Sequence, residues 1–248
     1  MPQMREYKAD LHIHTCLSPC AEIDITPKRI VDAAVEKGLH IIAVSDHNSA
    51  ENTQVAVKIG MERGLTVLPA MEITTSEEAH VLAIFGKVSD ALAMQEIVYR
   101  TLPEGYHDED RLGYQLIVNE NDEILEFCKR MFFGATGLPV KELVDRVHSL
   151  GGLAVASHID REYFSVLSQL GFIPPDVFFD GLEMSAAVSR QKADAVFGDY
   201  LSLPWITSSD AHNLDNIGRR YTSFSLESPS FEELVKAFKG ERRMGWDF

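Results

Sequence analysis

The feature that most constrains this sequence is a repeated order of apolar run, polar turn and amphipathic helix. Apolar runs that are typical of strands occupy residues 8–15, 40–46, 65–73, 80–86, 152–160, 181–185 and 205–212. Strands rich in Val, Ile, Leu and Ala that alternate with helices indicate βα units and a parallel sheet. About seven such units in one chain favour a closed α/β barrel over an open sheet.

Residues 87–138 interrupt this order. They begin with one helical pattern, DALAMQEIVYRTL, and continue as polar, irregular sequence in which GYQLIV and EILEF could form a small hairpin. We therefore expect a distorted, TIM-like barrel with an insertion after the fourth strand, and this insertion could lie over the barrel mouth. The length of 248 residues fits a single barrel domain spanning residues 1–248.

Composition excludes several classes of protein. No apolar run approaches the roughly 18–20 residues of a membrane span, and the N-terminal MPQMREYKAD lacks the apolar stretch of a secretory signal. Three cysteines are too few for a disulfide framework. We expect a cytoplasmic protein with no membrane partner. The net charge of −15, without a basic stripe, argues against long nucleic acid as a partner.

The histidines fall in a distinctive place. Five of the nine lie at the carboxyl ends of apolar runs: His12, His14, His47, His158 and His212. Side chains at that end of an α/β barrel converge on the active site. The others are less informative, because His80 begins an apolar run instead of ending one. For His40, His107 and His148 a surface position is the simpler interpretation.

Carboxylates occupy the same strand ends, namely Glu72, Glu183 and Asp210. Because residues two apart on a strand share a face, His12 and His14 point into one cavity, as do Asp210 and His212. Imidazoles and carboxylates that converge are the ligands of a divalent metal. There are more of them than one ion needs, which indicates two or three ions.

The ordered motifs DLHIHT, SDH, a strand-end Glu, HVLAI, SHID and SSDAH resemble the PHP (polymerase and histidinol phosphatase) domain family, from about Asp10 to Asn213. Within it the chain is most similar to the stand-alone metal-dependent phosphoesterases. The resemblance implies a distorted (β/α)7 barrel and a trinuclear metal centre. It implies one ion on His12, His14, Glu72 and Asp210, a second on Glu72, His80 and His158, and a third on His47, His212 and Cys20. Asp10 and Asp46 would then orient imidazoles through the far ring nitrogen.

Cys20 departs from the family pattern, because many members have His at this position. A thiolate would favour zinc or iron over magnesium or manganese. Alternatively Cys20 is a bystander, and Glu22 or Asp24 supplies the ligand or the third ion is weakly held. The identity of the metal, whether zinc, iron or manganese, stays open, as does the oligomeric state.

The implied chemistry is hydrolysis of a phosphate ester by a metal-activated hydroxide, with no side-chain nucleophile. The substrate would be a small phosphorylated metabolite, a nucleotide or a short oligonucleotide. Arg161 and Arg190 follow strand ends and are candidates for binding its phosphate, whereas Arg219 and Arg220 more simply pair with surface carboxylates. Two alternatives remain. One is an amidohydrolase-like C–N hydrolase, which usually needs a strand-end lysine for which only Lys87 is available. The other is a non-catalytic metal-binding scaffold with a regulatory role.

Overall fold

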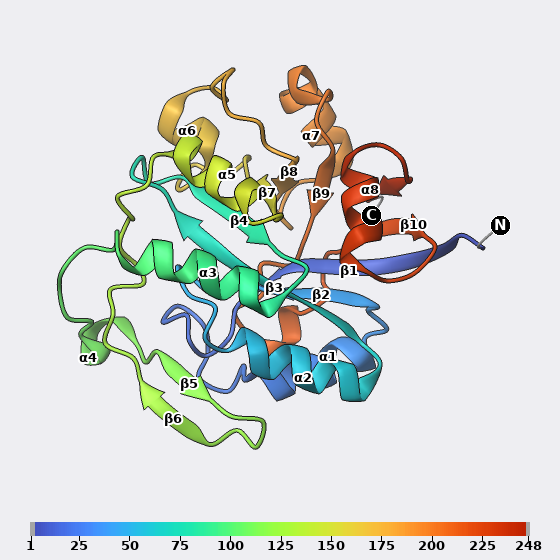
Figure 1. The fold of residues 1–248 in the computed structure, drawn as a ribbon. Coiled ribbons are helices and arrows are strands. Elements are labelled where there is room, and N and C mark those ends of the chain that lie inside the picture. The colour runs from blue at the N-terminus through green and yellow to red at the C-terminus, as the bar shows by residue number, and fades with distance from the viewer. Residues whose placement is uncertain (1–2, 247–248) are drawn as a thin grey trace.

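Seven strands form a nearly closed barrel, which confirms the predicted fold (Figure 1). The structure is a computed structural model that describes residues 3–246. The barrel strands, in spatial order, are β1 (Arg5–Ile13), β2 (Ile41–Val44), β3 (Thr66–Thr74), β4 (His80–Ile84), β7 (Leu153–Ala156), β8 (Gly181–Met184) and β9 (Trp205–Thr207). A parallel bridge between Ile13 and Ala211 joins the two ends of this row. Beyond β1 the sheet continues with β10 (Thr222–Leu226) and β11 (Met244–Gly245).

One barrel strand runs against the others. β4 pairs antiparallel with both β3 and β7, whereas the pairs β1–β2, β2–β3, β7–β8 and β8–β9 are parallel. The first residue of β4, His80, therefore lies at the same rim as the carboxyl ends of the parallel strands. The expectation that this rim collects only strand ends was wrong for β4, because apolar periodicity carries no information on strand direction.

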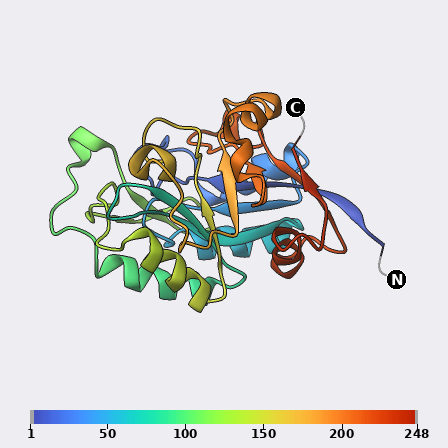
Figure 2. The same ribbon diagram turned by 90° about the horizontal axis from the view of Figure 1, so that it is seen from above.

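Helices cover the outside of the barrel (Figures 1 and 2). They are α1 (Pro27–Glu36), α2 (Thr53–Arg63), α3 (Val88–Tyr99), α5 (Val140–Ser149), α6 (Val166–Leu170), α7 (Arg190–Phe197) and α8 (Phe231–Phe238), with short 3-10 helices η1 (Gly198–Tyr200) and η2 (Leu214–Asn216). Thr26 caps α1 by accepting a hydrogen bond from the Arg29 backbone, as its sequence predicts. None of the helices between residues 3 and 246 combines the length and the hydropathy that a membrane crossing requires.

The side chains that point into the barrel change from apolar to polar along the barrel axis. On β3 the inward side chains are Leu68, Ala70 and then Glu72, and on β4 they are Ile84, Leu82 and then His80. Apolar side chains fill the lower layers, and α8 packs Leu234 and Phe238 against them. Gly181 is required for this packing, because a Cβ there would lie 2.7 Å from the Phe238 ring. The core thus supports a polar layer at one rim.

A bulge in β1 aims the first pair of histidines. The register with β2 shifts between Asp10 and Ile13, so that one extra residue is accommodated on β1. Leu11 lies in the inner core, whereas Ile13 packs outward against α1 and α2. A bulge of this kind bends the strand and redirects side chains. As a result His12 and His14 both face the rim of the barrel while Leu11 still fills its interior.

The segment 87–138 contains more regular secondary structure than its polar, irregular sequence predicts. Its first part is α3, which packs on the barrel, and α4 (Glu109–Leu112) follows. The predicted hairpin is present as β5 (Leu116–Val118) and β6 (Ile124–Phe127). The α4 region extends away from the barrel in both views (Figures 1 and 2). The assignment of residues 1–248 to a single domain stays a prediction.

Candidate metal centre

Glu72 is the hub of the polar rim. Its carboxylate is 1% exposed and lies within 3.5 Å of five imidazoles. Oε1 lies 3.0 Å from His80 Nδ1, 3.1 Å from His158 Nε2 and 3.4 Å from His12 Nε2. Oε2 lies 3.2 Å from His47 Nδ1 and 3.5 Å from His14 Nε2. The two oxygens therefore face different sets of ring nitrogens, which is the arrangement of a carboxylate that can bridge two ions.

A second group of donors meets next to Glu72. His12 Nε2 and His14 Nε2 are 3.1 Å apart, and Asp210 Oδ1 lies 3.5 Å and 3.2 Å from them. His158 and Asp210 have φ angles of 29° and 48°, which non-glycine residues seldom adopt. Such strained backbone clusters at functional sites, where the surroundings hold it in place.

Within residues 3–246, three groups of side chains each bring together one ligand atom from every member, with these atoms within 4.8 Å of one another. They are His12 with His14 and Asp210, His47 with Glu72 and His80, and His14 with His47 and His212. Each residue in them belongs to the predicted ligand set. The sequence-based division assigned Cys20 to the ion of His47 and His212, whereas here the third donor beside these two is His14. The allocation of ligands to individual ions stays a proposal.

Hydrogen bonds on the far ring nitrogens orient the imidazoles. His12 donates from Nδ1 to Glu183 Oε2 at 2.9 Å, and His212 donates from Nδ1 to the Asp210 carbonyl at 2.9 Å. His14 Nδ1 contacts Ser18 Oγ at 3.0 Å, and that hydroxyl donates to Asp46 Oδ1 at 2.7 Å. Each contact fixes the orientation of its ring and directs Nε2 toward the rim, which is the arrangement that metal ligation through Nε2 requires.

The structure corrects the prediction for Asp10 and refines the one for Asp46. Asp10 accepts backbone hydrogen bonds from Ser209 at 2.9 Å and Gly218 at 2.8 Å, and makes no hydrogen bond to an imidazole within residues 3–246. Asp10 therefore holds the loop that follows β9 and does not orient an imidazole ring. Asp46 acts on His14 only through Ser18. Glu183, whose strand-end position was noted but which was assigned no role, contacts the far ring nitrogen of His12 directly.

Charges around the cluster set the protonation of its members. Burial alone would raise the pKa of Glu72, but the imidazoles, His80 and His12 foremost, hold it well below the usual value. Burial lowers the pKa of His14 to about 4, assisted by His212. Burial would also lower the pKa of His12, but the carboxylates of Glu183 and Glu72 raise it well above its ordinary value. The cluster thus favours ionised carboxylates and attracts positive charge.

Divalent cations fit this arrangement. Nε2 of His12, Nε2 of His14 and the oxygens of Glu72 and Asp210 face one another at 3.1–3.5 Å. Among residues 3–246, the one Lys or Arg side chain that pairs with them is Arg161, which contacts the outer oxygen of Asp210. Buried acceptors at this spacing repel one another unless a proton or a cation lies among them. Nitrogen and carboxylate oxygen ligands suit zinc, iron and manganese.

Cys20 lies at the edge of this centre. It is exposed and lines the same cavity as His47, Glu72 and His212, but it belongs to none of the three donor groups found in residues 3–246. Ligation by Cys20 therefore stays a prediction. Glu22 and Asp24, the alternatives, do not line the cavity.

The candidate phosphate-binding arginines differ. Arg161 lines the cavity and donates to Asp210 Oδ2 at 2.5 Å, so it stands where an anion bound at the centre would meet it. Arg190 does not line the cavity, and its guanidinium pairs with Asp194 at 2.9 Å and lies 5.4 Å from the Trp205 ring centroid. Its role in phosphate binding stays a prediction that these contacts do not support. Lys87 follows the opposite end of β4 from His80, so no strand-end lysine joins the centre.

The cavity over the centre has a volume of about 230 Å³, and two phenyl rings flank it. Phe164 stacks on His80 with ring centroids 4.8 Å apart, and Phe133 lies 5.8 Å from His47. Asn48 holds the Phe133 loop by donating to the carbonyls of Phe132 and Gly134. Phe133 belongs to the segment 87–138, so this segment contributes to the rim. Whether it selects a substrate stays a prediction.

This donor set on this barrel defines a class of protein. Residues 10–169 match the PHP domain, and residues 195–242 match the PHP-associated region. The chain belongs to the PHP domain family, which confirms the resemblance seen in the sequence.

Two relatives of known sequence are similar over much of the chain. The uncharacterized protein YqxK of Bacillus subtilis is 25% identical over 269 residues, covering 96% of this chain and 63% of its own length. The uncharacterized protein MJ1587 of Methanocaldococcus jannaschii is 25% identical over 191 residues, covering 74% of this chain and 84% of its own.

Solved structures share the fold. The lesion-specific endonuclease Q of Pyrococcus furiosus superposes with a TM-score of 0.73 at 21% identity, over 97% of this chain and 58% of its own. A structure of endonuclease Q holds a 27-mer duplex with an abasic lesion at the active site. A protein assigned as a metal-dependent phosphoesterase from Bifidobacterium adolescentis gives a TM-score of 0.62 at 19% identity, over 93% of this chain and 96% of its own.

Proposed function

We propose that the protein hydrolyses phosphate esters with two or three divalent cations held by the rim of the barrel. The observation that carries this proposal is the Glu72 carboxylate, which faces five imidazoles with its two oxygens divided between them. Bound there, divalent cations lower the pKa of water and offset charge on phosphoryl oxygens. The protein's own part is to fix the geometry and to keep the site shaped.

Individual residues have separate tasks in this proposal. Glu72 would bridge ions, with His12, His14 and Asp210 on one side and His80 and His158 on the other. Glu183 and Ser18 hold the tautomers of His12 and His14 through 2.9 Å and 3.0 Å contacts, which keeps Nε2 free to ligate. Arg161 would exchange part of its contact with Asp210 for a phosphoryl oxygen.

No protein nucleophile is needed, and we propose that none forms a covalent intermediate. Among the side chains that line the cavity, Cys20 is the one with a thiol, and none is a serine. A water molecule would attack phosphorus in line with the leaving group, which Arg161 and the cations stabilise electrostatically.

The substrate is proposed as a small phosphorylated metabolite, a nucleotide or a short oligonucleotide. Duplex DNA must be tested beside them, because endonuclease Q has the same fold and binds a duplex with an abasic lesion. The net charge of −15 was taken to disfavour long nucleic acid, but the shared fold is compatible with it. Zinc, iron and manganese are the proposed metals, and a cytoplasmic location stays a prediction.

The decisive test is turnover with defined metals. Purified protein is stripped with chelator, reloaded with Mn²⁺, Fe²⁺ or Zn²⁺, and assayed on phosphorylated metabolites, nucleotides, oligonucleotides and an abasic duplex. We expect phosphate release or strand cleavage that depends on metal. Glu72→Ala and His14→Ala should abolish it. The matched control is His148→Ala, because His148 lies on the exposed face of α5 and pairs with Asp180.

The opposite result would be a protein that binds metal but cleaves no phosphoester. In that case the amide substrates of C–N hydrolases become the next set to assay. If those are inert as well, the metal-binding scaffold without catalysis is the surviving interpretation.

A further inference from the structure

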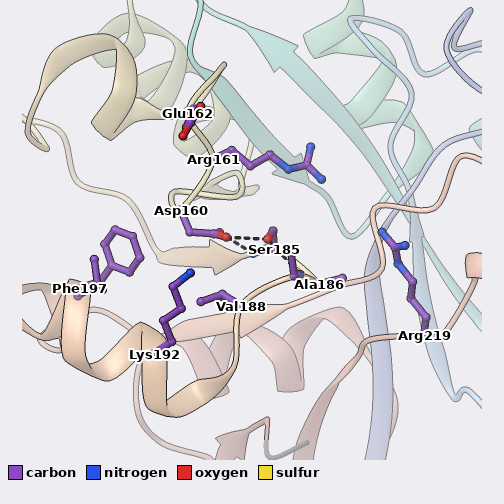
Figure 3. A pocket seen from close by; sticks show the side chains of 11 residues that line it. Asp160, Arg161, Glu162, Ser185, Ala186, Val188, Lys192, Phe197 and Arg219 are labelled. Atoms are coloured by element: carbon purple, nitrogen blue, oxygen red, sulfur yellow. Dashed lines mark hydrogen bonds between the residues drawn. The ribbon is translucent and has the colours of Figure 1, made fainter.

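A second cavity of about 470 Å³ adjoins the metal cavity. Arg161 lines both, so the two cavities meet at this side chain. Figure 3 shows the second cavity between the loops that follow β7 and β8, α7, and the loop that follows β9. The proposed function assigns no role to this second cavity.

Cations from separate elements line this cavity. Lys192 points from α7 into it, while Arg161 and Arg219 extend on the side opposite Phe197 (Figure 3). Lys192 makes no ion pair within residues 3–246, and Arg219 donates from Nε to the Ser209 carbonyl. Arg161 is paired with Asp210, whereas neither Lys192 nor Arg219 pairs with a carboxylate among residues 3–246. In a chain with 38 acidic and 23 basic residues, two such cations at one cavity favour binding of an anion.

Two carboxylates, Asp160 and Glu162, also line the cavity, and neither pairs with Lys192 or Arg219 in the described part of the chain. Asp160 uses both oxygens on Ser185, accepting from its backbone at 2.7 Å and from its hydroxyl at 2.6 Å. Glu162 lies apart from Lys192, at the upper edge in Figure 3. The remaining wall is apolar and includes Val188 and Phe197, so the cavity can also hold the carbon frame of an organic ligand.

We propose that this cavity binds a second anionic group, a phosphate or a carboxylate, of the substrate whose phosphate ester lies over the metal centre. Lys192 and Arg219 would contact that group, and Arg161 would stand between the two anions. The proposal rests on the proposed function for the identity of the reacting group. It adds that the preferred substrate is doubly anionic, with its two charged groups a fixed distance apart.

Binding is tested without turnover, using ligands that cannot be hydrolysed. Alkane-1,n-bisphosphonates of three to eight carbons are compared with alkane monophosphonates and ω-carboxyalkyl phosphonates of the same length, on metal-loaded protein, by calorimetry. At one chain length the second anionic group should tighten binding about tenfold or more, the usual worth of a charge-assisted hydrogen bond. The phosphonate and carboxylate series identify which anion the cavity prefers.

Variants show which residues cause the tighter binding of the doubly anionic ligands. Lys192→Met should remove most of this gain in affinity while leaving the affinity for monophosphonates unchanged, and Lys192→Arg should restore the gain. Lys239→Met is the matched control, because Lys239 is equally exposed and ends α8, which packs at the other end of the barrel. Circular dichroism checks that each variant is folded.

Two outcomes would overturn the proposal. One is equal affinity for the singly and doubly anionic ligands at every length. The other is a gain that survives both Lys192→Met and Arg219→Gln. These outcomes are separable from failure of the proposed function, because an inactive protein that still prefers bisphosphonates keeps the second site and loses only the hydrolysis.

Discussion

Two buried glutamates in this molecule have opposite kinds of neighbours. Glu233 on α8 accepts from Arg242 Nε at 2.8 Å and Lys236 Nζ at 2.5 Å, both permanent cations. Glu72 on β3 faces five imidazoles, none of which carries a permanent charge. Both carboxylates are at most 4% exposed. Lys236 and Arg242 balance the charge of Glu233, whereas the neighbours of Glu72 are imidazoles, which can release their protons and bind a divalent cation in exchange. This contrast separates a structural ion pair from a metal centre.

The largest effect is expected from removing the charge of Glu72. Glu72→Gln keeps the size of the side chain but takes away the bridging charge, so hydrolysis should fall on the order of 10³-fold. Initial rates under saturating Mn²⁺ measure this. Glu233→Gln in the same assay should retain nearly full activity, and a comparable loss there would remove the distinction between the two glutamates.

Metal removal should destabilise the protein through the Glu72 cluster alone. At a free metal concentration about a thousandfold above Kd, binding stabilises the folded state by about 4 kcal/mol. For a chain of this length that corresponds to a Tm shift of about 10 °C. Calorimetric melts with and without chelator give the shift. The Tm shift should be much smaller in Glu72→Gln and should persist in Glu233→Gln, and a wild-type protein whose Tm does not change with chelator would contradict the prediction.

An intermediate effect is expected at Glu183, which orients His12 through its 2.9 Å hydrogen bond. Loss of a partner of this kind typically weakens metal affinity about 10–100-fold. Competition of Glu183→Ala against a fluorescent chelator measures the change, and Glu183→Gln, which can still accept from Nδ1, should recover part of it. Asp10→Asn serves as the comparison, because Asp10 contacts backbone amides and no imidazole.

The smallest effect concerns the stability contributed by Glu233. Its pKa is lowered to about 2, chiefly by the hydrogen bond from Arg242. Because the folded pKa is depressed, the stabilisation is complete above the usual value of 4.5 and is lost as pH falls toward 2. Glu233→Gln should cost about 2 kcal/mol at pH 7. Urea unfolding from pH 7 to pH 3 should show that the difference in free energy of unfolding between wild type and Glu233→Gln becomes smaller. A difference that does not change with pH would refute its origin in the ion pair.

Much of the fold and of the centre could be predicted from the sequence, because both rest on local patterns. The period of two places His12 and His14 on one face, and apolar runs that end in ligand-type residues mark the rim. Seven such runs became the seven barrel strands, with boundaries within a few residues.

Features that depend on contacts between distant segments could not be predicted in this way. The direction of β4, which brings His80 to the rim, follows from its pairing with β3 and β7. Glu183 meets His12 across 171 residues, and Arg190 turns to Asp194 and the Trp205 ring. Asp10 lies beside the histidines in sequence, but the loop after β9 competes for its oxygens. Family resemblance supplied His80, for which the residues alone gave no argument.

Metal stoichiometry tests the central claim most directly. Purified wild-type protein, Glu72→Gln and Glu233→Gln are equilibrated with Mn²⁺ or Zn²⁺, freed of excess ion and measured by elemental analysis. We predict two or three ions for each chain in the wild type and in Glu233→Gln, and at most one in Glu72→Gln. Wild-type protein without bound metal, or equal metal content in wild type and Glu72→Gln, would contradict a metal centre built around Glu72.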